Sequence, residues 1–358
     1  MRIELKKVLF PQPKSKIKAG DGKVEGEYKF FTSSPIQSKF IDEANYDKPA
    51  LIFGTGGNAS VHYCDEPFST STDCLVMYGR SQIELETIYN YLKSNIGILE
   101  NGFKGAGLKH ISKEFILAIE IELPSEEIQL EFLQKNRIID GLIEAKQAQL
   151  HLSEELVKSR FIEMFGDCKE SRKLEEYAVL ITKGASPKWQ GFDYCDEGVL
   201  FVTSENVREG FLDLSKRKYL PQGINDILPR SVLKKNDILI NIVNASIGRA
   251  AIYDSDELAN INQAVALVRL KPNVLNLSFL LTYLNSDEAC ASYDFMKVGG
   301  DKANLSLKNI SDLKIPVASM ERQLEFESFK KQVDKSKYIE KISVRVLTIF
   351  WQKVYIWK

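Results

Sequence analysis

The feature that most constrains this chain is a stretch of roughly 40 residues, from Ser125 to Gly166, with the periodicity of one long helix. Ser125 is suited to cap its first turn, and Glu126 and Glu127 place negative charge at the positive end of the helix dipole. Apolar residues recur at spacings of three and four, at Ile128, Phe132, Ile138, Leu142, Leu150, Leu156, Phe161 and Phe165. Such a helix would be on the order of 60 Å long. We therefore expect a coiled-coil strut, which requires a partner helix.

The start of this helix is repeated near the other end of the chain. Residues 121–132 read IELPSEEIQLEF and residues 315–326 read IPVASMERQLEF, so Ile, Glu, Gln, Leu, Glu and Phe recur at identical spacing. Internal similarity of this kind indicates a tandem duplication of a domain followed by a long helix. The predicted fold class is α+β (mixed α/β). It consists of two β-rich globular domains separated by long helices, which pack as an antiparallel coiled coil with pseudo-twofold symmetry.

Four segments follow from the repeat: a first domain at 1–124, the long helix at 125–166, a second domain at 167–318 and a second long helix at 319–358. The two domains show the same order of patterns. In the first we expect strands at 3–5, 28–31, 50–53 and 115–123, a helix at 87–92 and loops at 11–29 and 102–107. In the second we expect strands at 199–202 and 237–240, a helix at 279–284 and loops at 180–191 and 298–306. Each domain also contains an Asn-Ala-Ser turn, at 58–60 and 244–246.

The composition is that of a globular protein with adequate cores, 44% hydrophobic and 27% charged. Lys plus Arg number 48 and Asp plus Glu 49, a net charge of −1, which argues against bulk binding of nucleic acid but permits a local basic groove. We find neither a run of about 18 apolar residues nor a signal-peptide pattern, so no membrane association is expected. The five cysteines are scattered without a C-x-x-C, which predicts reduced thiols and a cytoplasmic location.

None of the candidate catalytic motifs is convincing. The glycine run at 54–57 follows a strand, but it lacks the Lys-Ser/Thr of a P-loop and the full G-x-G-x-x-G, so a tight turn explains it better. His62 and Cys64 have no second His/Cys pair at zinc-finger spacing, and helix-start charge accounts for Glu126 and Glu127. No G-x-S-x-G or H-E-x-x-H surrounds the three histidines. We therefore predict no catalytic centre, no metal site and no cofactor bound by this chain.

The chain carries instead two sets of polar loop residues with the chemistry of DNA contacts. Lys and Arg contact phosphates, while Asn, Gln and Arg read base edges in the major groove. The first set comprises Lys16, Lys18, Lys23, Ser33, Ser34, Gln37, Asn58, His62, Lys104 and Lys109. The second set comprises Lys183, Ser186, Lys188, Gln190, Ser204, Asn206, Asn244, Arg249, Asn262, Gln263, Lys302 and Asn304. Two such surfaces carried on rigid helices would suit the reading of two separated patches of a duplex.

In these respects the sequence resembles the specificity (S) subunit of type I restriction-modification enzymes over nearly its whole length. The resemblance rests on weak motifs whose order is repeated. They are Leu5 and Leu174 near the domain starts, the strand and turn segments at 51–63 and 238–249, the segments at 109–112, 262–263 and 304–306, and both helix starts.

The resemblance implies two target-recognition domains, each reading one half of a bipartite site in double-stranded DNA. It also implies a methyltransferase subunit docked at each end of the helix pair, with restriction subunits joining through the complex. S-adenosylmethionine, ATP and Mg²⁺ would then be bound by those partner subunits. The C-terminal tail departs from the family pattern: residues 343–358, SVRVLTIFWQKVYIWK, are β-branched and aromatic and contain no acid. The second helix is therefore expected to stop early, near Ile342.

Two other classes of protein remain to be distinguished. A non-catalytic scaffold with duplicated protein-binding domains would not bind duplex DNA with a steep dependence on salt. A self-sufficient DNA-modifying enzyme would bind S-adenosylmethionine alone, and the missing cofactor motifs argue against it.

Overall fold

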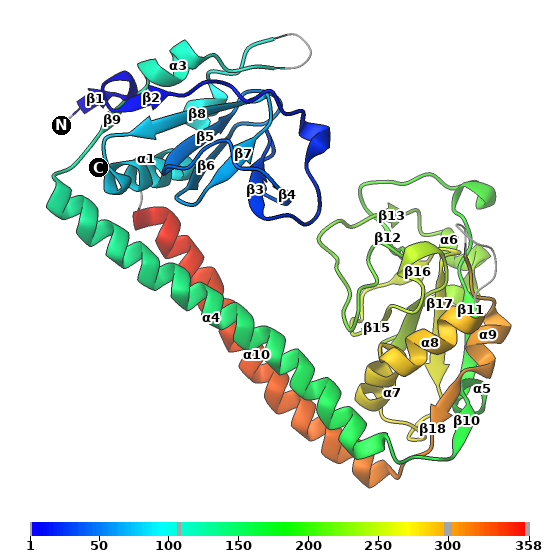
Figure 1. The fold of residues 1–358 in the computed structure, drawn as a ribbon. Coiled ribbons are helices and arrows are strands. Elements are labelled where there is room, and N and C mark those ends of the chain that lie inside the picture. The colour runs from blue at the N-terminus through cyan, green and yellow to red at the C-terminus, as the bar shows by residue number, and fades with distance from the viewer. Residues whose placement is uncertain (1, 106–108, 297–302, 355–358) are drawn as a thin grey trace. The chain divides into compact units, whose positions relative to one another are not determined.

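The structure is a computed structural model that describes residues 2–105, 109–296 and 303–354, with side chains as far as residue 349 (Figure 1). The chain divides into two compact units. Unit 1 comprises Met1–Ala148 together with Lys341–Lys358, and unit 2 comprises Gln149–Glu340. Within the described ranges, no helix is both long and apolar enough to cross a membrane.

Unit 1 is built on two small sheets. The four-stranded antiparallel sheet has the order β2 (Leu9–Pro11), β8 (Cys74–Gly79), β5 (Ala50–Gly54) and β6 (Ser60–Cys64). The three-stranded sheet has the order β4 (Lys39–Ile41), β3 (Tyr28–Phe31) and β7 (Phe68–Thr70), with β3 and β7 parallel. Strands β1 (Arg2–Glu4) and β9 (Glu120–Glu122) form a separate antiparallel ribbon. The helical elements are η1 (Leu5–Lys7), η2 (Ala19–Asp21), α1 (Gln82–Ser94), α2 (Gly97–Glu100) and α3 (Lys113–Ala118).

Strand β5 shows how the sequence builds the layers of unit 1. Successive side chains of a strand point to opposite faces of the sheet. Leu51 and Phe53 belong to the core shared with Leu85, Ile88 and Leu92 of α1, which packs on one face. Ala50 and Ile52 belong to the core shared with Phe31 and Phe68 of the three-stranded sheet on the other face. The unit is therefore layered as helix, sheet and sheet, and β5 is buried on both sides.

Unit 2 repeats this plan strand for strand. Its four-stranded sheet has the order β11 (Ala178–Lys183), β17 (Val265–Leu270), β14 (Asp237–Asn241) and β15 (Ala250–Tyr253). Its three-stranded sheet has the order β13 (Tyr219–Leu220), β12 (Val199–Val202) and β16 (Ala259–Ile261), again with one parallel pair, and β10 (Ser171–Lys173) pairs with β18 (Lys314–Pro316). The helical elements are α5 (Leu174–Tyr177), η3 (Lys188–Gln190), α6 (Ile224–Ile227), η4 (Pro229–Ser231), η5 (Asn244–Ser246), α7 (Leu277–Leu284), α8 (Asp287–Met296) and α9 (Leu307–Asp312). The predicted duplication and mixed fold class are confirmed.

The two long helices start in the same way. Helix α4 runs without a break over Glu126–Phe165, and α10 runs over Met320–Val354. The Gln129 side chain donates to the carbonyl of Pro124 at 3.0 Å, and the Gln323 side chain donates to the carbonyl of Ala318 at 2.8 Å. The glutamine that recurs in the sequence repeat thus hydrogen-bonds to the segment just before each helix and fixes it to the first turn.

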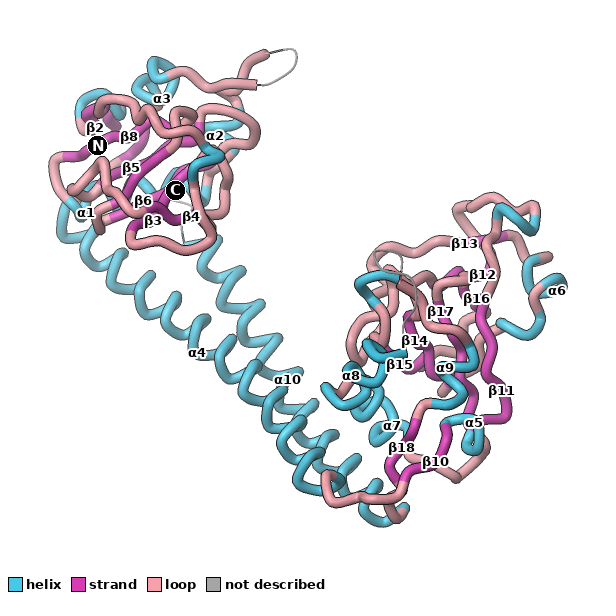
Figure 2. The backbone as a smooth tube through the Cα atoms, turned by 45° about the vertical axis from the view of Figure 1, so that its right-hand side comes forward, coloured by secondary structure: helices cyan, strands magenta, loops and turns pink. Residues whose placement is uncertain are grey.

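In unit 2 the two helices pack antiparallel, as predicted (Figure 2). Phe161 and Phe165 of α4 contact Phe326 of α10, with ring centroids 5.2 and 5.7 Å apart. Farther along, Lys337 of α10 pairs with Glu154 of α4 at 3.0 Å, so residue numbers rise on one helix as they fall on the other. Phe279 of α7 lies 4.7 Å from Phe165, which joins the helix pair to the second β-rich domain.

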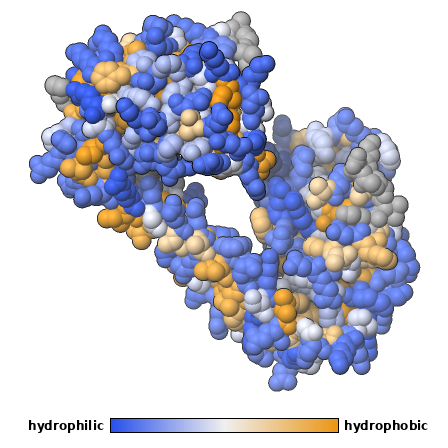
Figure 3. All heavy atoms as spheres, in the orientation of Figure 1, coloured by the Kyte–Doolittle hydropathy of each residue, from blue (hydrophilic) through white to orange (hydrophobic). Residues whose placement is uncertain are grey.

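The predicted apolar seam of α4 is only partly right. Phe132, Phe161 and Phe165 are buried, but Ile128, Ile138, Leu142 and Leu156 are exposed. The remaining buried apolar residues of α4 are Leu133, Ile139, Val157 and Met164. Figure 3 shows hydrophobic patches interrupting the polar surface over α4. A long helix can carry two apolar stripes, and periodicity alone does not say which one faces the partner helix.

The expectation that the second helix stops near Ile342 is wrong, because α10 continues to Val354. β-Branched and aromatic residues lower helix propensity by only a few tenths of a kcal/mol each, on the order of 0.5. The last turns of α10, from Lys341 to Val354, belong to the same compact unit as the first half of α4. Tertiary packing therefore outweighs the local preference of this tail.

Two local assignments also need correction. Residues 115–118, predicted as strand, belong to α3, because the Ser112 side chain accepts the Phe115 amide at 3.1 Å and caps a helix there. Residues 180–183, predicted as loop, extend strand β11 through its pairing with β17. The predicted loops at 102–107 and 298–306 fall partly outside the described residues.

Candidate nucleic-acid interface

The polar loops of unit 1 gather where β3 and β5 end. The amide of Gly57 donates to the Lys109 carbonyl at 3.3 Å, and the amide of Ile111 donates to the Thr55 carbonyl at 3.1 Å. A backbone bridge between Lys104 and His110 closes the second loop on itself. These bonds hold the turn at 55–59, which carries Asn58, beside the loop that carries Lys104 and Lys109.

The basic loop of unit 1 reaches the same end of the sheet. The Thr72 amide donates to the carbonyl of Ile17 at 2.9 Å, which places Lys16 and Lys18 on either side of that contact. Thr72 immediately precedes Asp73, whose carbonyl accepts the Thr55 amide at 2.8 Å. The loop, the turn after β5 and the start of β8 are therefore neighbours. Lys16, Lys18 and Asn58 lie at one end of the sheet, whereas the long helix starts from the β1–β9 ribbon.

Some predicted contact residues of unit 1 are engaged within the fold. The Ser33 hydroxyl donates to the Asp73 carbonyl at 2.7 Å, and the Gln37 side chain donates to the Lys39 carbonyl at 2.6 Å. Lys23 forms an ion pair with Asp42. Ser34 is exposed, and its carbonyl lies 2.9 Å from Nε2 of His62.

His62 is held as a structural residue. Its ring lies 5.2 Å from that of Phe31, and burial lowers the pKa of the imidazole, although the bond to the Ser34 carbonyl opposes this effect. A neutral ring whose Nε2 donates to a carbonyl fits this setting. We therefore assign His62 to the support of the 33–34 segment rather than to a direct contact.

Unit 2 repeats the backbone clamp of unit 1 bond for bond. The Asn244 amide donates to the Ala303 carbonyl, and the Leu305 amide donates to the Ile242 carbonyl, both at 2.9 Å. Asn304 bridges Val243 as His110 bridges Gly56. The polar loops of the two units thus share a frame, although the loops it holds differ in sequence.

This frame corrects the match between the two Asn-Ala-Ser turns. The matched bonds place Asn244 opposite Gly57, not opposite Asn58, so the two Asn-Ala-Ser triplets are out of register by one residue. Both matched residues have positive φ, +82° for Gly57 and +57° for Asn244. Gly and Asn are the residues that adopt this left-handed conformation most readily.

The predicted contact residues of unit 2 also divide into exposed and structural groups. Asn206 is buried: its side-chain oxygen accepts the Thr203 amide at 2.9 Å, and its amide group donates to the Asp213 carbonyl at 3.0 Å. It stabilises its own loop and has no free group for DNA. The half-buried Asn262 accepts the Ala264 amide at 3.1 Å and shapes the turn before β17. Ser186, Gln190 and Ser204 are half-buried, and Lys302 lies outside the described residues.

What remains is a group of solvent-exposed polar side chains at matched loop positions. Among the described residues they form no ion pair or side-chain hydrogen bond, so their charges and amides are free for a partner. They are Lys16, Lys18, Asn58, Lys104 and Lys109 in unit 1, and Lys183, Lys188, Asn244, Arg249, Gln263 and Asn304 in unit 2. Such a set can pair with phosphates and hydrogen-bond to base edges.

One exposed residue was missed by the sequence reasoning. Trp189 lies between two of the predicted contact residues, Lys188 and Gln190, and 88% of it is exposed. The sequence does contain a sign of this residue's exposure, because Trp189 is an aromatic residue within a loop that is basic and contains glycine.

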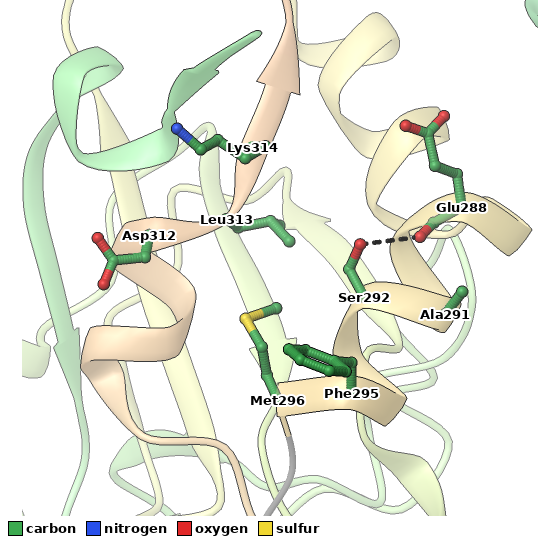
Figure 4. Close-up of a pocket in the computed structure, with 8 residues that line it drawn as sticks. All are labelled: Glu288, Ala291, Ser292, Phe295, Met296, Asp312, Leu313 and Lys314. Carbon is green, nitrogen blue, oxygen red and sulfur yellow. Dashed lines mark hydrogen bonds between the residues drawn. The ribbon is translucent and has the colours of Figure 1, made fainter.

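The described residues contain no group of His, Cys, Asp and Glu side chains that could hold a metal ion. A hollow on unit 2 is lined by α8, the end of α9 and the start of β18 (Figure 4). Its wall combines Phe295 and Met296 with Glu288 and Asp312. It lies on the elements that flank the clamped segment at 303–305 in the chain, and the carboxylates of Glu288 and Asp312 distinguish it from the basic polar surface.

Comparison with known proteins assigns the chain to a family. The type I restriction modification DNA specificity domain matches it twice, at residues 4–151 and 171–346. The chain is 22% identical over 344 residues to the type I restriction enzyme MjaVIII specificity subunit of Methanocaldococcus jannaschii, covering 88% of this chain and 81% of that protein. It is 23% identical over 308 residues to the EcoBI specificity subunit of Escherichia coli, covering 77% of this chain and 64% of that protein.

Two solved structures share the fold. The S subunit of a type I restriction-modification system from M. genitalium superposes with a TM-score of 0.56 at 15% identity, covering 99% of this chain and 94% of that one. A chain from a study of complex assembly and conformational transition in the type I R-M system gives 0.64 at 15% identity, covering 99% and 96%.

The chain therefore belongs to the family of type I restriction-modification DNA specificity proteins. It is a DNA sequence specificity subunit, a non-catalytic component of such a complex, as the sequence predicted.

Proposed function

We propose that this subunit reads a bipartite site in double-stranded DNA, with one half-site bound by each recognition domain. The proposed functional parts are a first recognition domain at 1–124, a spacer helix at 125–166, a second recognition domain at 167–318 and a second helix at 319–358. The observation that supports this proposal best is the repeated backbone clamp, which presents free cations and amides from matched loops in both units.

Within this proposal the loop residues have two roles. Lys16, Lys18, Lys104, Lys109, Lys183 and Lys188 contact phosphates, which gives affinity without sequence preference. Asn58, Asn244, Gln263, Asn304 and Arg249 reach base edges, which gives sequence preference. Six further residues stabilise the loops through contacts within the protein: Lys23, Ser33, Gln37, His62, Asn206 and Asn262.

The methyltransferase subunits are proposed to dock on the exposed apolar residues of the long helices, two copies binding one chain. The residues available on α4 are Ile128, Leu130, Ile138, Leu142, Leu152, Leu156 and Ile162. Apolar residues spaced along a helix face are typical of a surface covered by a partner. Restriction subunits would join through this complex in the cytoplasm, and S-adenosylmethionine, ATP and Mg²⁺ would be bound by the partner subunits.

The decisive experiment is co-purification of the chain with a methyltransferase subunit, followed by mapping of methylated adenines in the DNA of the host. A bipartite motif with a fixed gap is the expected result. If methylation shows no sequence motif, or a single uninterrupted one, the proposal is wrong.

A charge test then separates affinity from sequence choice. Replacing Lys16 and Lys18 together by Ala should weaken binding to every duplex and reduce the salt slope by up to about two units. The matched control is the double replacement of Lys6 and Lys7, which lie in η1, before the start of β2. Strand β2 runs antiparallel to β8, so these lysines lie at the end of the sheet opposite Thr72, and their loss should leave the slope unchanged.

A further inference from the structure

The turn that carries Trp189 is anchored on both sides. Pro187 is buried, and its carbonyl accepts the amides of Gln190 at 2.9 Å and Phe192 at 3.0 Å. Gly191 has φ of +78°, which reverses the chain at the end of η3. Phe192 packs against the small core that contains Val199 and Ile224. Backbone bonds and packing therefore fix this turn, while the indole of Trp189 projects from it.

The base of the same loop is fixed against the recognition frame. A Cβ added to Gly184 would lie 1.7 Å from the carbonyl oxygen of Ile261, so the loop passes directly against the end of β16. The next residues of the chain are Asn262 and Gln263, whose turn precedes β17. The Trp189 loop thus leaves the sheet close in the chain to Gln263, which is proposed to face DNA.

An exposed indole in this setting is costly unless a partner covers it. Trp is among the most buried residue types on average, because a large apolar area gains most from leaving water. Here the neighbours along the chain are Lys188 and Gln190, and Lys183 at the base of the loop is exposed without an ion pair among the described residues. A flat apolar ring beside a free cation matches a nucleic acid, which offers an aromatic base beside an anionic phosphate.

We propose that Trp189 stacks on a nucleobase of the half-site bound by the second recognition domain. This inference rests on the proposed function. Lys188 and Lys183 hold the adjacent phosphates, and the indole covers the face of a base that is exposed at a flexible or unstacked step. Trp189 thereby contributes affinity and favours half-sites that contain such a step.

The first recognition domain lacks this contact. Its loop has the equivalent 3₁₀ turn η2, in which the Asp21 amide donates to the Lys18 carbonyl as that of Gln190 donates to Pro187. Gly20 then occupies the place of Trp189, and residues 12–27 contain no aromatic residue. Stacking is therefore confined to the second half-site.

A binding experiment on the purified methyltransferase complex tests this inference, with a labelled duplex that carries the mapped motif. Trp189→Ala should weaken binding roughly 10- to 100-fold. Trp189→Phe should restore most of the affinity, because a smaller ring still stacks. The salt slope should not change, since no charge is removed. The control is Phe295→Ala: Phe295 is 92% exposed in the same unit, but it lies on α8 beside the acidic side chains of the hollow, and its loss should change nothing (Figure 4).

A second readout identifies the base. With 2-aminopurine placed at successive positions of each half-site, binding should change its fluorescence at one position of the second half-site only, and Trp189→Ala should abolish that change. Unaltered binding by Trp189→Ala, or no response of any 2-aminopurine, would overturn the inference while leaving the proposed function intact. Loss of methyltransferase co-purification by Trp189→Ala would show a protein contact and also overturn it. If the parent complex does not bind the duplex, the proposed function itself fails.

Discussion

The two β-rich units of this chain share a backbone frame but differ in what that frame presents. Strand order, strand register and the bonds that clamp the recognition loops match between them. The turn after β5 occupies residues 55–59, whereas the one after β14 occupies residues 242–249 and is longer. The first surface is dominated by lysines, and the second adds Trp189 and Arg249.

The combination of a shared frame and different loop residues indicates where a duplicated protein of this kind tolerates changes in sequence. Backbone hydrogen bonds do not depend on side-chain identity, so the clamp survives while the residues it presents vary. Buried strands tolerate little change, because interiors are packed to near-crystal density. We therefore expect variation in specificity to be concentrated in the clamped loops.

The largest expected effect tests how the helix pair is joined to the second unit. Phe326 is fully buried among Phe161, Phe165 and Phe279. Phe326→Ala should lower the free energy of unfolding of unit 2 by about 3–5 kcal/mol, because it leaves a cavity within this cluster. Thermal denaturation of the full chain would measure it. Leu324→Ala, on the same helix but half-exposed, is the control and should cost under about 1 kcal/mol.

The next effect tests whether the Trp189 loop depends on close contact with β16. Gly184→Ala should destabilise unit 2 by about 3 kcal/mol, because the added methyl group would collide with the Ile261 carbonyl. Gly20→Ala, in the basic loop of the first domain, has nothing within 4 Å of its added Cβ and should be neutral. Equal stability of the two variants in chemical denaturation would show that the loop base is not fixed as described.

A smaller effect tests the one-residue offset between the two turns. Asn244→Gly keeps the left-handed backbone and removes only the side chain, so it should relax base choice at the second half-site by about 1–3 kcal/mol per contact. Asn58→Ala should do the same at the first half-site only. Methylation mapping with each variant checks this. A uniform loss at both half-sites would contradict the assignment of roles.

The smallest effect concerns pH and should be confined to the first domain. Burial lowers the pKa of His62 in the folded chain, so protonation favours the unfolded state. The stability that His62 contributes is present above its unfolded pKa, about 6.5, and is lost as pH falls below it. Its counterpart in the register of the second domain, Ala251, cannot titrate. Denaturation at pH 7.5 and 5.5 should therefore show a smaller loss for His62→Gln than for the parent, and an equal loss in both proteins would exclude this role.

The sequence by itself determined the duplication, the long helices and the positions of the buried strands. Each of these rests on a signal carried along the chain: the repeated Gln, Leu, Glu and Phe at each helix start, and the alternating apolar residues of strands such as β5. It also located the loops that hold most of the exposed polar residues, because lysines, asparagines and glycines gather there.

Only the tertiary structure decided which apolar stripe of α4 is buried, how far α10 continues and which loop residues are free. Ile138 and Leu142 are exposed while Leu133 and Ile139 are buried, a choice made by contacts with residues far along the chain. Asn206 and Asn244 look alike in the sequence, yet one is bonded inside its loop and the other faces solvent. Burial and hydrogen bonding depend on which distant segments of the chain contact each other, and no local sequence pattern specifies those contacts.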